Sequence, residues 1–352
     1  MGAVLLKCRN LTTAFGKKVV LDNINLDVQQ GEILGIIGAS GSGKTTLLNT
    51  IIGFLKPEKG DILFRHSQFL PDGERQGYSS VFKQKELFKQ VYGFAAQMPS
   101  FYKKLTVKEN LQYFGRLYNL SEEAIVQNAE TLLRLMELKT AENTLAGNLS
   151  GGMERRLDIG LSMMHDPSLL ILDEPTADLD PVLRRNIWNL ISTINKKGTT
   201  ILLSSHYLEE MEHLCTRIAI LKNAKIQEIG SPEELRQKYL KEEEVIIESY
   251  PGEYQRVIPK LRTKAIIKAE ARGTELILKT TNTAKALSEI LRIFEGTKEN
   301  IIEVKVVKQT LEDMFINLDL FNNTAKNEQV AVEYPGEETT PEFEIAKKGK
   351  QP

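Results

Sequence analysis

A glycine-rich segment between a strand pattern and a helix pattern is the strongest constraint in this sequence. Glu32–Ile37 is typical of a buried strand, Gly38–Thr45 fits G-x-x-x-x-G-K-[ST], and helical spacing resumes over Thr45–Phe54. Glycines let such a loop curl so that its backbone N–H groups converge on phosphate at a helix N-terminus. The order strand, glycine loop, helix therefore predicts a phosphate-binding loop, with a glycine turn that binds nothing as the alternative.

The loop supplies most of the candidate nucleotide-binding residues. Lys44 would neutralise phosphate charge, and the hydroxyl of Thr45 would bind Mg²⁺. The full candidate set is Gly38, Ala39, Ser40, Gly41, Ser42, Gly43, Lys44, Thr45 and Thr46.

Further buried strands indicate a parallel sheet. Val19–Val28 alternates apolar and polar residues, while Leu169–Leu172 and Thr199–Leu203 are continuous apolar runs separated by helical stretches such as Pro181–Asn195. Strands that alternate with helices imply a sheet with covered faces, and hence an α/β fold.

Two carboxylates follow the second of these strands. Asp173 and Glu174 would lie at the carboxyl edge of the sheet, where open α/β sheets bind ligands. Asp173 suits a magnesium site, which it would hold through water, and Glu174 could accept a proton from an attacking water. His206 follows the strand at Thr199–Ser205, from which it could hydrogen-bond a γ-phosphate. An acidic turn that merely closes a strand is the alternative for the carboxylates.

The remaining chain divides by pattern. Pro99–Asp166 is typical of a helical insert, and Ser121 is expected to cap one of its helices. From about residue 240 the expected order is strand, helix, strand, strand, helix, strand, the split ferredoxin-like order. Residues 321–352 are poor in apolar residues, so we expect disorder there.

Composition and charge disfavour several function classes. The 352 residues carry 46 Lys and Arg against 47 Asp and Glu, which argues against a surface whose main task is to grip nucleic acid. Cys8 and Cys215 form no metal spacing and are expected to be reduced and packed. The first ten residues lack a secretory signal pattern, and no stretch approaches the roughly 20 apolar residues of a membrane helix. A cytoplasmic chain that does not cross a bilayer by itself is therefore expected.

A more specific resemblance rests on Leu149-Ser150-Gly151-Gly152-Met153, upstream of the Asp173-Glu174 strand. This segment resembles the signature motif of ABC-type ATPases. Other motifs of that family have counterparts here in the family's order. Phe15 resembles the adenine-stacking aromatic, and Gln97 before Leu105–Leu111 resembles the Q-loop. Ala177–Asp180 resembles the D-loop, and His206 resembles the switch histidine. Together these motifs cover residues 1 to about 230.

The resemblance implies a P-loop NTPase of the ABC-ATPase type. The expected units are an ATPase domain over residues 1–232 with a helical insert at about 98–166, an α+β ferredoxin-like module over 240–320, and a disordered tail over 321–352. The implied cofactors are ATP and Mg²⁺, the metal being held by Thr45, Gln97 and Asp173. The implied catalytic residues are Glu174, His206, Lys44 and Gln97.

The resemblance also implies partners. Two copies, or one copy and a homologous ATPase, would sandwich two ATP molecules head to tail, with Ser150, Gly151 and Gly152 acting in trans and Asp180 in the D-loop. A separate integral membrane permease would be driven by this dimer at the cytoplasmic face of the membrane, with no nucleic acid involved.

Departures from the commonest family pattern point toward export. Met153 stands where glutamine is usual, and Gly151–Leu157 and Thr310–Leu318 are similar to an export and drug-resistance subgroup. Thr310–Leu318 also fits a simple amphipathic helix. Arg65–Tyr92 is longer and more polar than the family's usual loop before the Q-loop. The alternatives are a soluble ABC ATPase acting on ribosomes or DNA, and an ATP sensor without turnover; the transported compound is not encoded in these residues.

Overall fold

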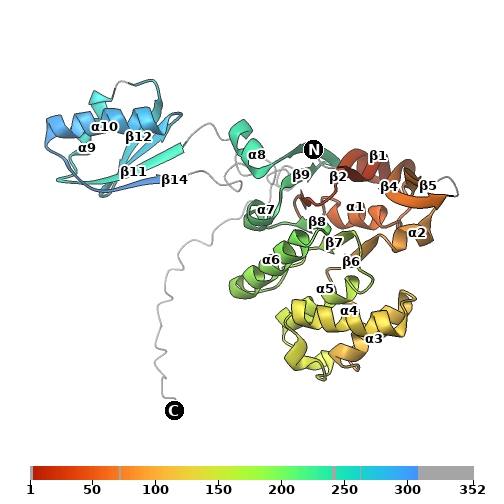
Figure 1. The fold of residues 1–352 in the computed structure, drawn as a ribbon. Coiled ribbons are helices and arrows are strands. Elements are labelled where there is room, and N and C mark those ends of the chain that lie inside the picture. The colour runs from red at the N-terminus through yellow and green to blue at the C-terminus, as the bar shows by residue number, and fades with distance from the viewer. Residues whose placement is uncertain (1–2, 71–72, 240–242, 262, 308–352) are drawn as a thin grey trace, which may run out of the picture.

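The computed structural model describes residues 3–70, 73–239, 243–261 and 263–307 (Figure 1). The expected tail at 321–352 and the expected helix at Thr310–Leu318 lie outside these residues. Among the described helices, none is both long enough and apolar enough to span a membrane.

A six-stranded sheet forms the centre of the first part of the chain (Figure 1). In spatial order its strands are β10 (Lys225–Gly230), β9 (Arg217–Lys222), β3 (Ile33–Ile37), β8 (Thr200–Ser205), β7 (Leu169–Asp173) and β6 (Tyr92–Ala95). The pairs from β9 to β6 are parallel, and β10 is antiparallel to β9. The α/β fold class expected from the sequence is confirmed.

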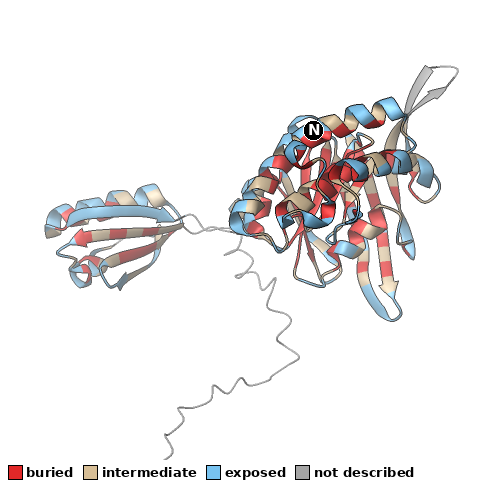
Figure 2. Cartoon of the chain, turned by 90° about the horizontal axis from the view of Figure 1, so that it is seen from below, coloured by how far each residue is buried: buried red, intermediate tan, exposed pale blue. Residues whose placement is uncertain are grey.

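Hydrophobic clusters cover both faces of this sheet. Successive strand residues point to opposite faces, and in β3 Ile33 and Ile37 belong to one cluster whereas Leu34 and Ile36 belong to the other. Every residue of β3, β7 and β8 is buried, as expected for parallel strands with helices on both sides (Figure 2). The loops at the carboxyl ends of these strands are therefore fixed to a rigid core.

A second, antiparallel sheet packs against the first through one of these clusters. Its order is β2 (Lys18–Gln29), β1 (Val4–Phe15), β4 (Lys59–Leu70) and β5 (Gly73–Ser80). The segment Arg65–Tyr92, whose length and polarity left its local structure open, contains the end of β4, all of β5 and the short helix α2 (Lys85–Lys89). β4 pairs with β1 on one side and with β5 on the other, and the edge strand β5 pairs with β4 along its length. This cross-strand pairing is why a polar sequence can form strands here.

Helix α1 (Lys44–Ile51) follows the glycine loop and is shorter than the helix expected over Thr45–Phe54. Its C-cap is Ile52, and the next residue, Gly53, has a φ of +75°, which no continuing helix adopts. The expected phosphate-loop order of strand, loop and helix is present.

The helical insert consists of α3 (Val107–Leu117), α4 (Glu122–Leu135) and α5 (Gly151–Ser162), with two 3₁₀ turns between α4 and α5. The Ser121 hydroxyl accepts a hydrogen bond from Ala124 N at 3.2 Å, so this expected helix cap is confirmed. After the insert come α6 (Pro181–Lys196), α7 (Leu208–Leu214) and α8 (Pro232–Tyr239).

The C-terminal module has the expected βαββαβ order. Its strands β12 (Ile266–Arg272), β13 (Glu275–Thr280), β11 (Glu243–Tyr250) and β14 (Asn300–Val307) form one antiparallel sheet in that spatial order. The second helix is α10 (Thr283–Thr297). The first helix of that order is split into α9 (Tyr254–Val257) and a 3₁₀ turn at Ile258–Lys260, where Pro259 lacks the N–H that a longer α-helix would use.

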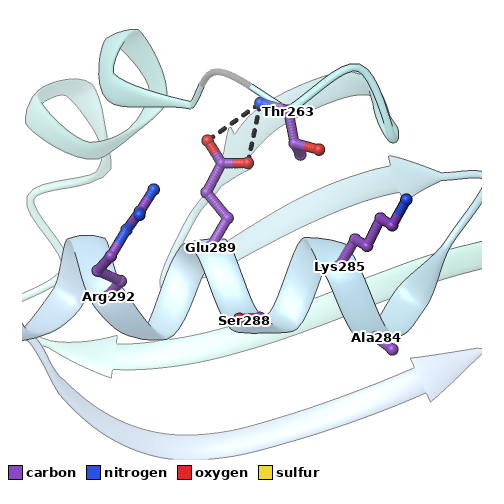
Figure 3. A pocket seen from close by; sticks show the side chains of 6 residues that line it. All are labelled: Thr263, Ala284, Lys285, Ser288, Glu289 and Arg292. Atoms are coloured by element: carbon purple, nitrogen blue, oxygen red, sulfur yellow. Dashed lines mark hydrogen bonds between the residues drawn. The ribbon is translucent and has the colours of Figure 1, made fainter.

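A surface cavity of about 580 Å³ lies along α10 (Figure 3). Within it, the carboxylate of Glu289 accepts hydrogen bonds from Thr263 N at 3.1 and 2.9 Å. Glu289 is buried, whereas Lys285 and Arg292 on the same helix are exposed. The carboxylate therefore ties α10 to the segment before β12.

Candidate functional site

The phosphate loop is shaped by glycines with positive φ. Gly41 and Gly43 have φ values of +75° and +106°. A Cβ atom on Gly43 would lie 3.0 Å from both Val20 O and Val20 Cγ1, so β2 closes one side of the loop. Gly43 is the N-cap of α1 and offers no side chain to the first N–H groups of that helix. Those donors are therefore available to an anion.

Lys44 is held at the centre of the loop. Its side chain is 5% exposed, and Nζ lies 2.9 Å from Gly38 O and 3.4 Å from Ala39 O. The same Nζ lies 3.4 Å from Glu174 Oε1. A buried ammonium at this place supplies the positive charge that a bound polyphosphate requires.

The two carboxylates at the end of β7 differ in their surroundings. Asp173 is buried and accepts a short hydrogen bond from Ser204 Oγ on β8. Glu174 has a φ of +46°, a strained value for a residue with a side chain. Its N–H is held by Ser204 O and Ser204 Oγ, each at 3.1 Å. Ser204 thus positions both acids at the edge of the sheet.

His206 meets Glu174 at the mouth of the site. Nδ1 of His206 lies 3.0 Å from Glu174 Oε2, and the imidazole is 41% exposed at its side chain. Lys44 and His206 therefore contact the two different oxygens of the Glu174 carboxylate, so all three side chains form one cluster.

A cavity of about 810 Å³ joins these groups, a size within the range of small-molecule sites. Its lining comprises Phe15, Lys18, Val20, Ala39, Ser40, Gly41, Gly43, Lys44, Thr45, Thr46, Gln97, Glu174 and His206. Most residues that the sequence proposed for ATP therefore surround one space. Lys18 and Val20 also line it, and they were missed because nothing in their local pattern separates them from other strand residues.

The proposed magnesium ligands are a hydroxyl, an amide oxygen and a carboxylate, which are donors that Mg²⁺ accepts. Thr45 and Gln97 line the cavity, whereas Asp173 lies behind it with one oxygen bonded to Ser204. This donor set fits a magnesium ion that Asp173 holds indirectly.

The signature and D-loop residues are absent from the lining of this cavity. Ser150 caps α5 by accepting from Met153 N at 3.4 Å, and Asp180 caps α6 by accepting from Val182 N and Leu183 N. A Cβ on Gly152 would lie 2.9 Å from Leu183 Cδ2, so the start of α5 packs closely on α6. Within one chain, both motifs have a clear structural role.

Comparisons with known proteins agree with this geometry. The family model described as "ABC transporter" matches residues 21–177. The linearmycin resistance ATP-binding protein LnrL of Bacillus subtilis (strain 168) is 30% identical over 318 residues, covering 89% of this chain and 98% of that protein. The Nod factor export ATP-binding protein I of Rhizobium sp. (strain N33) is 29% identical over 323 residues, covering 90% and 98%.

Solved structures are similar over about two thirds of the chain. An ATP-binding cassette of an ABC transporter in its ADP conformation has a TM-score of 0.58 at 28% identity, covering 67% of this chain and 94% of that one. A dimeric cassette in a post-hydrolysis state, bound to ADP and Pi, has a TM-score of 0.54 at 26% identity, covering 64% and 98%. Phosphate loop, paired acids, histidine and relatives lead to one conclusion: the chain belongs to the ABC transporter family and is one of its ATP-binding subunits.

Proposed function

We propose that this subunit hydrolyses ATP in the cavity around Lys44, Glu174 and His206, and that the hydrolysis drives export by a separate membrane permease. The observation that carries the proposal is the contact of Lys44 and His206 with the two oxygens of Glu174. Lys44 neutralises charge, Glu174 accepts a proton, and His206 donates a hydrogen bond to the phosphate. These are the requirements of phosphoryl transfer to water.

In the proposed reaction, Glu174 accepts a proton from water while the water oxygen forms a bond to the γ-phosphorus. The bond from that phosphorus to the bridging oxygen breaks, which releases ADP and phosphate. Lys44 and the loop N–H groups stabilise the phosphate oxygens, His206 hydrogen-bonds the γ-phosphate, and Gln97 helps to position the water. When bound, Mg²⁺ would be held by Thr45, Gln97 and, through water, Asp173, and would neutralise charge on the β- and γ-phosphates.

The complete site is proposed to form only between two ATPase subunits. Ser150, Gly151 and Gly152 lie at the start of α5, outside the cavity of their own chain. A helix N-terminus with a hydroxyl and small residues can approach the γ-phosphate of ATP bound to the partner subunit. Asp180 would lie at the same junction, and Phe15, 54% exposed at the cavity, would stack on adenine.

The permease is proposed to bind next to Gln97. Met98 is 79% exposed and Tyr102 is 49% exposed, so apolar surface follows directly on a residue of the nucleotide site. Movement at the nucleotide would thereby reach the membrane protein. Export is proposed because relatives are named for antibiotic resistance and Nod factor export, and the named relatives give no support to a role on ribosomes or DNA. We place the complex at the cytoplasmic face of the membrane and divide the chain at residues 1–232 and 240–320.

The test is purification of the tagged full chain from membranes of its own cells, followed by ATPase assays in liposomes with the co-purifying integral membrane protein. We expect one membrane protein to be retained and to change the ATPase rate. A Lys44→Ala chain should retain the same partner without turnover. A chain that binds no membrane protein, and whose turnover no membrane fraction alters, would contradict the transport function.

A further inference from the structure

A buried arginine on α5 contacts the backbone on both sides of Glu174. Arg155 is 6% exposed. Its Nε donates to Pro175 O at 2.8 Å, and its Nη2 donates to Asp173 O at 3.0 Å. Because these carbonyls belong to the residues before and after Glu174, the guanidinium fixes the strained turn that carries the acid.

The same guanidinium also reaches the segment that carries Gln97. Nη1 of Arg155 donates to Ala96 O at 2.6 Å, directly before Gln97. One side chain thus holds backbone from the end of β7 and backbone from the end of β6. The rigid fork of five N–H donors in arginine can make these contacts together, whereas a lysine ammonium cannot span them.

Asp158, one turn further along α5, holds the other end of that segment. Its Oδ1 accepts from both Ser100 N and Ser100 Oγ at 2.9 Å, and its Oδ2 lies 3.4 Å from Arg155 Nη1. Asp158 is 1% exposed. Arg155 before Gln97 and Asp158 after it therefore fasten the residues 97–99 to α5 at both ends.

Burying the charges of Arg155 and Asp158 costs desolvation free energy, so this pair does little to stabilise a helix by itself. Burial lowers the pKa of Arg155 and raises the pKa of Asp158, so each charged form is penalised by its surroundings. Buried ion pairs add little net stability compared with apolar residues of similar size, although their loss leaves an unpaired charge. The specific geometry of the contacts, to three carbonyls and one serine beside the reacting groups, is what the pair provides.

We propose that Arg155 and Asp158 are positioning residues of the hydrolysis reaction. They set where Glu174 and Gln97 lie relative to the γ-phosphate, and they join these residues to the helix whose first residues, Ser150 to Gly152, serve the partner's site. This inference rests on the proposed ATPase function. Through α5, closure of the dimer on the nucleotide bound by the partner would change the position of this subunit's own Glu174.

Steady-state ATPase kinetics of the full chain test this role. Neither Arg155 nor Asp158 lines the nucleotide cavity, so Arg155→Gln should leave KM for ATP within about threefold while kcat falls by about 10- to 100-fold, as expected for misplaced reacting groups. Arg155→Lys keeps the charge without the fork and should recover only part of kcat.

Arg217→Gln is the matched control. Arg217 pairs with the buried Glu32 at 3.2 Å, at the start of β3 and β9 and away from the phosphate loop. Both glutamine variants leave a buried carboxylate without its arginine and should lower the melting temperature. Rates are compared per folded molecule, and only Arg155→Gln should lower kcat.

Ser100→Ala keeps the proposal testable if the Arg155 variants fail to fold. Ser100 is exposed as a residue, and loss of its hydroxyl removes one bond to Asp158. We expect kcat to fall by about fivefold with KM unchanged, as for one hydrogen bond. An unchanged kcat in Ser100→Ala, in Arg155→Lys or in folded Arg155→Gln overturns the proposal. If the wild-type chain hydrolyses ATP, and the Arg155 and Ser100 variants keep the wild-type kcat as Arg217→Gln does, the positioning role fails while the ATPase function stands.

Discussion

Glu174 shows how a single residue is prepared for chemistry by its neighbours. Its positive φ is held by two hydrogen bonds from its N–H to Ser204 and by Arg155 contacts to the residues on either side. Backbone strain of this kind persists only where surrounding structure over-determines it. The carboxylate is consequently presented to Lys44 and His206 with little freedom to turn away.

Gly43→Ala is expected to impair nucleotide binding. A side chain at a φ of +106° is strained, and the new Cβ would lie 3.0 Å from Val20 O. We expect a cost of about 1–2 kcal/mol in the free energy of unfolding and a distorted loop that binds ATP at least about tenfold more weakly. Titration with a fluorescent ATP analogue measures the affinity. Gly77→Ala on β5, where an added Cβ meets nothing within 4 Å, is the control, and equal affinities in the two variants would contradict the loop's role.

Glu210→Gln is expected to stabilise the protein at neutral pH. Glu210 on α7 is fully buried, and its Oε1 accepts from Thr176 Oγ1 at 2.9 Å and Trp188 Nε1 at 3.0 Å. Burial raises its pKa above the ordinary 4.5, against the opposing effect of its hydrogen bonds. The folded state therefore favours the protonated acid, and stability falls as pH rises from the ordinary pKa through the raised one.

Glutamine keeps an acceptor and carries no charge. Thermal melts from about pH 5 to about pH 8 should show a gain in melting temperature for Glu210→Gln that is largest at high pH and shrinks toward low pH. Glu209→Gln, on the exposed side of the same helix, is the control. A loss of stability at pH 8 would show that burial of the charge is not the dominant effect.

Lys44, Glu174 and His206 could be predicted from sequence because each follows a recognisable buried strand, and the carboxyl ends of parallel strands meet at one edge. Arg155, Asp158 and Glu210 could not be predicted in this way. Their burial depends on carbonyls and donors that are distant in sequence, and a charged residue on a helix is ordinarily exposed. α5 also carries Glu154 and Arg156, so nothing in its local sequence separates Arg155 and Asp158 from ordinary exposed charges.

At the scale of elements, two serine caps have different expected consequences. Ser121 caps α4 and Ser150 caps α5 in the same manner, each accepting from the N–H three residues on. Ser121→Ala and Ser150→Ala should each cost about 1 kcal/mol in stability. Only Ser150→Ala should also lower ATP turnover, because Ser150 is proposed to meet the partner's γ-phosphate, whereas ATP binding by the monomer should not change. Melting curves and ATPase rates distinguish the two effects, and equal turnover in both variants would contradict the role in trans.

Helices and strands with a strong period were predictable, and paired edges were not. The buried runs at β3, β7 and β8 carry their own signal in consecutive apolar residues. By contrast, the hairpin of β4 and β5 has a polar sequence, and its stability comes from pairing with β1 and from cross-strand contacts such as the hydrogen bond of Tyr78 Oη to Val4 O at 2.7 Å. Such long-range pairing leaves no local period in the sequence.

At the scale of the molecule, the nucleotide cavity draws on residues from Phe15 to His206, all carried by one pair of sheets and their helices. Separate hydrophobic clusters support this part and the βαββαβ module. The cavity is lined by most of the residues proposed to bind ATP, while the signature residues at the start of α5 lie outside it. This division explains why the ATPase is proposed to need two subunits.

ATP turnover by Glu174→Gln, measured beside ATP binding and the molecular mass in solution, tests the central claim most directly. The amide cannot accept the proton of the attacking water, but the phosphate loop is untouched. We predict ATP affinity within about threefold of wild type, turnover reduced at least about 100-fold, and a dimer that persists in ATP but not in ADP. Turnover at the wild-type rate by the folded variant would contradict the account.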